Sequence, residues 1–129
     1  MDSIKISVHE SDRDPDLTVV RVDGVIDTLT ATQLEEVLDK LLRRGRYQVV
    51  LDLAGVDYIS SAGWGIFISR IKEIRDNGGD IKLANMVANV LEIYELLEFD
   101  NILASFDNVN MARAAFSGMM TESAKKKPR

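Results

Sequence analysis

An apolar run at residues 47–53, YQVVLDL, constrains the fold more than any other part of the chain. Its β-branched centre is typical of an interior strand of a sheet. A few residues later the chain passes through Ser60 and Ser61 into residues 62–77, whose apolar side chains recur at helical spacing. An interior strand that leads into a helix favours a crossover connection, and therefore a parallel sheet.

The other apolar patterns predict further strands and helices around this unit. Strands are expected at residues 4–8, 17–22, 81–84 and 102–106, and helices at residues 30–44, 90–97 and 109–116. The first two strands are separated by a short polar turn, so we expect them to pair antiparallel. The chain is therefore predicted to form one α/β domain with a mixed, mostly parallel sheet of about five strands and about four helices.

Polar residues next to these segments suggest where the helices begin and where the domain ends. Thr28 or Thr30 is expected to cap the first helix, and Asp107 or Asn108 the last. The apolar stripe of the third helix is expected to include Val90, Ile93, Tyr94 and Leu97. Residues 1–118 are assigned to the domain, and residues 119–129 to a flexible basic tail.

Composition excludes several classes of function. The chain has no cysteine and a single histidine, His9, so thiolate metal sites, cysteine nucleophiles and histidine-dependent triads lack their parts. The formal net charge of −5 disfavours a nucleic-acid partner. No apolar run is long enough to cross a bilayer, and we expect a cytoplasmic protein with no metal and no cofactor.

Ser60 and Ser61 permit two roles. A hydroxyl at a strand-to-helix junction either caps the helix or carries a phosphate close to the free amides of its first turn. The surrounding ISSAG lacks the nucleophile-elbow pattern of serine hydrolases, and the following GWG is not a phosphate-binding loop. The small residues Ala62, Gly63 and Gly65 would let another surface approach closely.

The segment LDLAGVDYISSAGWG resembles the phosphorylation turn of the STAS family, in particular of bacterial anti-sigma factor antagonists. In that family an aspartate precedes a serine that a partner kinase phosphorylates. Ser61 falls on the phosphorylated serine, and Ser60 stands where the family usually has aspartate. Trp64 replaces the usual leucine, either as a core residue or as a partly exposed contact for a partner.

Three more segments resemble the same family in matching order. DGVIDTLTATQLEEVL places Asp27 on an aspartate that lies near the phosphorylation turn in the family, although Asp27 can equally be a helix-start residue. NGGDIKLANM resembles the strand that follows the phosphorylated helix, and LEFDNIL the passage into the last strand. The resemblance covers residues 4–116.

The resemblance implies a regulatory protein that is not an enzyme. Its unphosphorylated form would bind an anti-sigma factor serine kinase and release a sigma factor, phosphorylation of Ser61 would end that complex, and a phosphatase would restore it. The docking residues implied are Asp27, Asp57, Ser60, Ser61, Ala62, Gly63, Trp64 and Gly65. The alternative is a STAS scaffold that is not phosphorylated, as a subunit of a stress-sensing complex or of a lipid ABC transporter.

Overall fold

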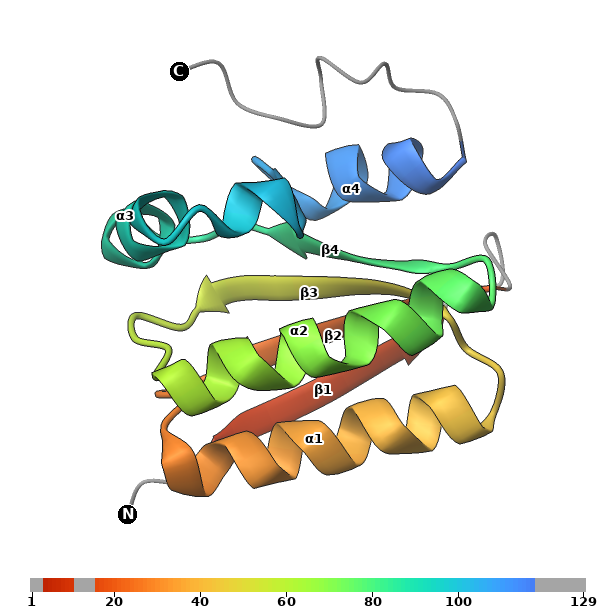
Figure 1. Ribbon diagram of the computed structural model, residues 1–129, viewed down its shortest axis with the longest axis horizontal. Helices are drawn as coiled ribbons and strands as arrows, with labels where there is room; N and C mark the ends of the chain where they lie inside the picture. The colour runs from red at the N-terminus through yellow and green to blue at the C-terminus, as the bar shows by residue number, and fades with distance from the viewer. Residues whose placement is uncertain (1–3, 11–15, 118–129) are drawn as a thin grey trace.

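A five-stranded mixed sheet forms the centre of the computed structural model, which describes residues 4–10 and 16–117 (Figure 1). The strands are β1 (Lys5–Glu10), β2 (Leu17–Asp23), β3 (Gln48–Gly55), β4 (Asp80–Ala84) and β5 (Ala104–Phe106), adjacent in the order of the chain. The β1–β2 pair is antiparallel and the other three pairs are parallel. The predicted fold class is confirmed. The predicted tail, residues 119–129, lies outside the described residues.

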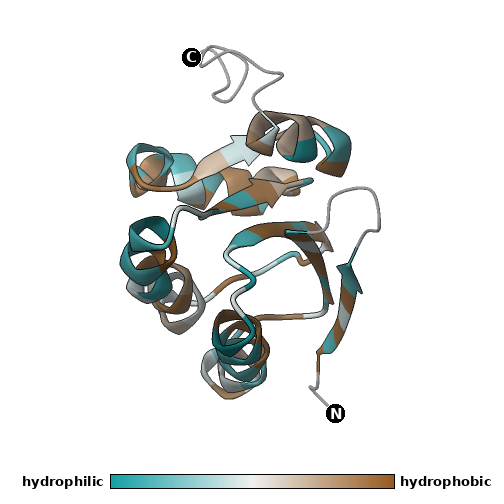
Figure 2. Cartoon of the chain, turned by 90° about the vertical axis from the view of Figure 1, so that its right-hand side faces the viewer, coloured by the Kyte–Doolittle hydropathy of each residue, from teal (hydrophilic) through white to brown (hydrophobic). Residues whose placement is uncertain are grey.

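The helices divide unequally between the two faces of the sheet (Figure 2). They are α1 (Thr28–Arg43), α2 (Ser61–Asp76), α3 (Ala88–Leu96) and α4 (Val109–Phe116), with a short 3-10 helix at Phe99–Asn101. Helices α1, α2 and α3 pack over one face and enclose the larger core, while α4 covers part of the other face. None of the helices in the described part of the chain is long and apolar enough to span a bilayer.

Strand β3 occupies the middle of the sheet, as its apolar sequence predicts. It pairs with β2 on one side and β4 on the other. The side chains of Val49, Val50, Leu51 and Leu53 are completely buried. Because both of its faces are covered, β3 holds the following turn and the start of α2 in a fixed position relative to the core.

The helix caps correct one prediction and decide between the alternatives of another. Asp27, rather than Thr28 or Thr30, caps α1, because its carboxylate reaches the amides of Leu29 and Thr30 while Thr30 lies inside the helix. The last helix, α4, is capped by Asn108, the second of its two candidates.

Helix α3 buries a narrower stripe than its periodicity predicts. Val90 and Tyr94 are buried, but Ile93 and Leu97 are 40% and 53% exposed, so their assignment to the core is wrong. The reason is that α3 contacts the 3-10 helix more than any strand, so only its Val90 and Tyr94 side reaches the core, and Leu97 is its C-cap.

A charged cluster joins α1 to α2. The guanidinium of Arg70 on α2 contacts the carboxylate of Asp39 at 2.8 Å and that of Glu35 at 2.6 Å, both on α1. We expect Arg70→Met to lower the free energy of unfolding by about 1 kcal/mol, because it removes two ion pairs that share one partly buried guanidinium. Lys72→Met is the control, because it removes a solvent-exposed pair with Asp76 on the same helix, and it should leave the urea unfolding curve unchanged. Equal effects of the two variants would contradict a stabilising role for the contacts of Arg70 between α1 and α2.

Candidate functional site

The turn between β3 and α2 lies directly beside the start of α1. An isolated parallel bridge pairs Ile26, just before α1, with Ile59, just before α2. Two backbone hydrogen bonds hold it: the amide of Ile26 donates to the carbonyl of Tyr58 at 3.0 Å, and the amide of Ser60 donates to the carbonyl of Ile26 at 2.8 Å. The N-termini of both helices, together with Asp27 and Ser61, are thereby brought to the same edge of the molecule.

The two serines of this turn have different environments. Ser60 is the N-cap of α2, and its half-buried hydroxyl accepts a hydrogen bond from the amide of Gly63 at 3.3 Å. Ser61 is the first residue of the helix and is exposed. Because Ser60 supplies the cap, the hydroxyl of Ser61 remains accessible to another molecule.

Asp27 is tied into its own helix by a capping box. Its carboxylate accepts hydrogen bonds from the amides of Leu29 and Thr30, both at 2.9 Å, while the hydroxyl of Thr30 accepts one from the amide of Asp27. The bond from the Thr30 amide is the main cause that lowers the pKa of the Asp27 carboxyl below its ordinary value of 3.8. The helix-start role considered for Asp27 is therefore observed, and its contact with a partner stays a prediction.

Removal of this cap should destabilise the domain in a pH-dependent way. We expect Asp27→Ala to lower the Tm at neutral pH by about 3–5 °C, because two amides lose their acceptor. A carboxyl whose pKa is lowered by folding stabilises the fold above its unfolded pKa and loses that effect as the pH falls. The Tm difference from wild type should therefore narrow below pH 3.8. Asp57→Ala, at an exposed carboxylate of the neighbouring turn, serves as the control and should change the Tm little.

The small residues after Ser61 serve different purposes. Gly63 is buried, and a Cβ atom there would lie 2.6 Å from the Cγ2 of Ile26 and 2.8 Å from that of Ile59. Gly65 is exposed and has open space around it, and Ala62 is half-buried. Gly63 thus permits the close approach of α2 to the bridge, whereas Gly65 leaves the helix surface flat beside Ser61.

Trp64 is a core residue, the first of the two roles considered for it. Its side chain is 3% exposed, so it offers little surface to a partner on the outside of the molecule. Its ring packs against Phe99 with centroids 5.0 Å apart, Phe67 at 5.9 Å and Tyr94 at 6.2 Å. These contacts fix the start of α2 against α3 and the 3-10 helix.

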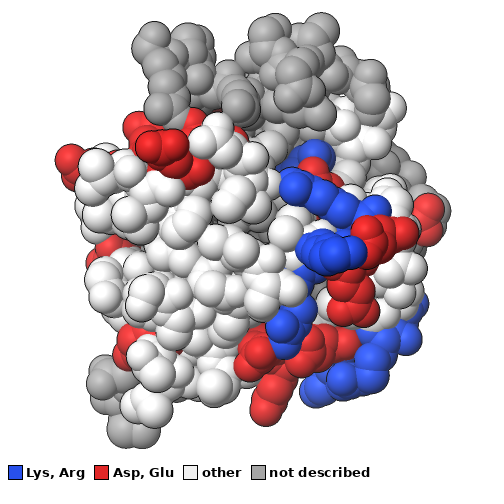
Figure 3. Space-filling model, viewed as in Figure 1, with Lys and Arg blue, Asp and Glu red and all other residues white. Residues whose placement is uncertain are grey.

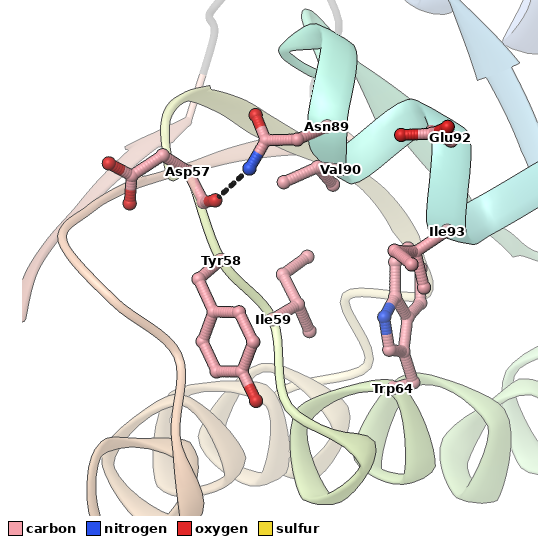
Figure 4. Close-up of a pocket in the computed structure, with 8 residues that line it drawn as sticks. All are labelled: Asp57, Tyr58, Ile59, Trp64, Asn89, Val90, Glu92 and Ile93. Carbon is pink, nitrogen blue, oxygen red and sulfur yellow. Dashed lines mark hydrogen bonds between the residues drawn. The ribbon is translucent and has the colours of Figure 1, made fainter.

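Helix α3 contributes residues to this region that the sequence did not assign to it. The side-chain amide of Asn89 donates a hydrogen bond to the backbone carbonyl of Asp57, as Figure 4 shows. The side chain of Asp57 itself is exposed, and that of Tyr58 is 53% exposed. The turn and α3 therefore form one continuous surface.

This surface carries exposed apolar side chains and acidic groups but no positive charge. We call it the Ser61 face and define it by residues 22–34, 54–66 and 85–99, which contain no lysine or arginine. Its exposed large apolar residues are Val25, Leu29, Tyr58, Ile93, Leu96 and Leu97. Its acidic residues are Asp23, Asp27, Asp57, Glu92, Glu95 and Glu98. Figure 3 shows that the Lys and Arg visible in that view lie over the opposite half of the molecule. Contiguous exposed apolar side chains are typical of a protein–protein contact.

The chemistry available in the described part of the chain is limited. No three of its His, Asp and Glu residues are grouped so as to hold a metal ion. His9 lies on β1, the strand at the opposite edge of the sheet from β5. What the arrangement around Ser61 does offer is an exposed hydroxyl on a surface without lysine or arginine.

Comparison with known proteins agrees with this picture. The STAS domain family profile matches residues 6–112 of the chain. The chain belongs to the STAS domain family. Among its STAS relatives, BtrV of Bordetella bronchiseptica, a candidate anti-sigma factor antagonist, is 33% identical over 100 residues, which cover 78% of this chain and 86% of BtrV. The anti-sigma-B factor antagonist of Staphylococcus epidermidis is 26% identical over 88 residues, which cover 68% of this chain and 82% of the relative.

Solved STAS structures share the fold at lower sequence identity. An anti-sigma factor antagonist from Mycobacterium paratuberculosis superposes with a TM-score of 0.80 at 23% identity, over 90% of this chain and 96% of that one. Unphosphorylated SpoIIAA superposes with a TM-score of 0.68 at 14% identity, over 90% of this chain and all of SpoIIAA. The family match over residues 6–112 confirms the resemblance to the STAS family, and these structures confirm the fold.

Proposed function

We propose that this STAS domain is an anti-sigma factor antagonist that is switched by phosphorylation of Ser61. The unphosphorylated protein would bind an anti-sigma factor serine kinase through the Ser61 face and so release a sigma factor. A phosphatase that acts on phosphorylated Ser61 would reset the switch. The observation that carries the proposal is the exposure of Ser61 at the first position of α2, next to a second serine that supplies the cap.

The charges and free amides of the turn favour a switch that prevents the partner from docking and leaves the fold of this domain unchanged. A phosphate adds about −1.5 to −2 charges. The free amides at the start of α2 favour an anion, so this domain can accommodate the group without refolding. A docked partner would have to desolvate the same group beside Asp27 and Asp57, on a face with no lysine or arginine to neutralise it. Phosphorylation is therefore expected to exclude the partner.

Phosphate mapping tests the assignment of the modified residue. The protein is incubated with ATP and each histidine-kinase-like serine kinase of its source, and the products are mapped by mass spectrometry. We expect one phosphate on Ser61, lost in Ser61→Ala and retained in Ser60→Ala, because of the two serines of the turn Ser61 is the exposed one and Ser60 supplies the cap. Phosphate on Ser60, or transfer from none of these kinases, would contradict the proposal.

One observation favours a second candidate, a STAS scaffold that is never phosphorylated. The residue before Ser61 is Ser60, so the carboxylate that usually precedes the phosphorylated serine in the family is missing here. Such a scaffold would copurify with a stress-sensing complex or with a lipid transporter, and Ser61→Ala would leave that assembly intact. Stable copurification of this kind together with unmodified Ser61 would replace the first proposal by the second.

A further inference from the structure

A pocket of about 250 Å³ lies between the β3–α2 turn and α3, within one helical turn of Ser61 (Figure 4). The turn, the first turn of α2 and the outer face of α3 each supply part of its wall. Its lining residues are Asp57, Tyr58, Ile59, Trp64, Asn89, Val90, Glu92 and Ile93. Apolar side chains dominate the interior, so a side chain of another molecule could be buried there with a gain in free energy.

The indole of Trp64 brings an unused hydrogen-bond donor to this pocket. Its Nε1 atom is buried and has no hydrogen-bond partner. Figure 4 shows the nitrogen on the edge of the ring that faces Ile59 and Tyr58. A buried donor without an acceptor is costly, and native structures rarely keep one without reason. The pocket thus offers an occupant one directed hydrogen bond besides its apolar wall.

The charged residues at the rim of the pocket are all acidic. Asp57 stands at the turn and Glu92 on α3, and both are exposed. No lysine or arginine of the Ser61 face can balance them. An occupant with positive groups on either side of its buried part would therefore gain attraction at the rim.

We propose that this pocket anchors one side chain of the protein partner of the Ser61 face. The anchoring side chain has an apolar stem and an oxygen or sulfur acceptor for Trp64 Nε1, and lysine or arginine residues flank it in the partner. This inference rests on the proposed function in that the same partner contacts Ser61. The wall of the pocket includes the exposed Asp57 and Tyr58 of the turn that leads to Ser61, so a single partner can cover Ser61 and reach into the pocket.

Two other occupants fit the site less well. An anionic amphiphile such as a fatty acid would bring its carboxylate next to Asp57 and Glu92, and like charges repel. A second copy of this chain, related by a two-fold axis, would bring one acidic Ser61 face against another. A basic protein segment meets neither obstacle.

The first test uses the only tryptophan of the chain as a reporter. Its indole N–H gives a single resonance in a ¹⁵N-labelled sample, and a new hydrogen bond should move that resonance downfield. The probe is the intact anti-sigma factor kinase that phosphorylates Ser61, added without nucleotide. We expect the Trp64 resonance to shift on binding.

The second test changes the charge at the rim of the pocket. Glu92→Lys should weaken binding of the kinase about tenfold, because it turns attraction at the rim into repulsion.

Glu73→Lys provides the matched control, since it makes the same change of charge at an exposed site near the other end of α2. It should bind within about twofold of wild type. If the kinase phosphorylates Ser61 but the Trp64 resonance stays in place, or if Glu92→Lys binds like Glu73→Lys, the pocket inference is overturned while the proposed function stands.

If no kinase binds, the proposed function fails, and a second probe then tests the pocket independently. It consists of synthetic peptides with a central tyrosine between two pairs of lysines, the same peptide with alanine for tyrosine, and one with glutamates for lysines. A Trp64 shift with the first peptide alone supports the pocket. No shift with any of them, or a shift with decanoate instead, overturns it.

Discussion

Gly63→Ala should destabilise the domain although alanine is the better helix former. The added methyl would lie 2.6 Å and 2.8 Å from methyl groups of Ile26 and Ile59, which the bridge between the two helix starts holds in place. Overpacking of this kind costs about 1–3 kcal/mol of unfolding free energy. We expect a corresponding loss in urea unfolding, together with shifts of the amide resonances around Ser61, because α2 must move away from the bridge.

Gly65→Ala is the control for that variant, two residues further along the same helix. No neighbouring atom lies within 4 Å of the position of its Cβ. Here the preference for helix should dominate, and the variant should gain about 0.5–1 kcal/mol. If Gly63→Ala were as stable as Gly65→Ala, the bridge would be free to adjust, and the close approach of α2 would not depend on glycine.

Ser61→Glu should weaken binding of the anti-sigma factor kinase about 100-fold, which corresponds to about 3 kcal/mol. The reason is that a charged, larger group stands at the centre of a face that must be desolvated for the partner to dock. The Tm should not fall, because a carboxylate in the first turn of a helix is favourable. Titration calorimetry and thermal unfolding on the same sample separate the two effects.

Ser69→Glu is the matched control for charge on α2. Ser69 is exposed on the same helix, eight residues beyond Ser61, and lies outside the pocket and the turn. Its kinase affinity should stay close to wild type. Tighter binding of Ser61→Glu would mean that the partner presents cations opposite Ser61, and it would contradict the exclusion mechanism.

The fold around Ser61 is predictable from the sequence because local and global signals agree there. The β-branched centre of β3 requires cover on both faces, and the periodicity after Ser61 requires a helix, so a parallel crossover follows. Ser60 as a cap was one of two roles considered, and the structure assigns it. Asp27 was considered as a helix-start residue, but the cap was expected from Thr28 or Thr30, because threonine is also a good cap and only geometry decides which oxygen reaches the amides.

The pocket beside Ser61 could not be predicted, since its walls come from segments about thirty residues apart in sequence. One signal was present: LEIYELLEF has more apolar residues than a single buried stripe needs. Ile93 and Leu97 were assigned to the apolar stripe of the helix, whereas the structure exposes both of them and also Leu96. The missing information was that α3 packs on the 3-10 helix rather than across the sheet, which leaves these side chains exposed.

The most direct test of the switch is a calorimetric titration of one anti-sigma factor kinase with three forms of this protein: unphosphorylated, fully phosphorylated on Ser61, and phosphorylated then treated with a phosphatase. The account predicts tight binding of the first form, binding at least about 100-fold weaker for the second, and full recovery for the third. Equal affinity of the kinase for the phosphorylated and unphosphorylated forms would contradict it.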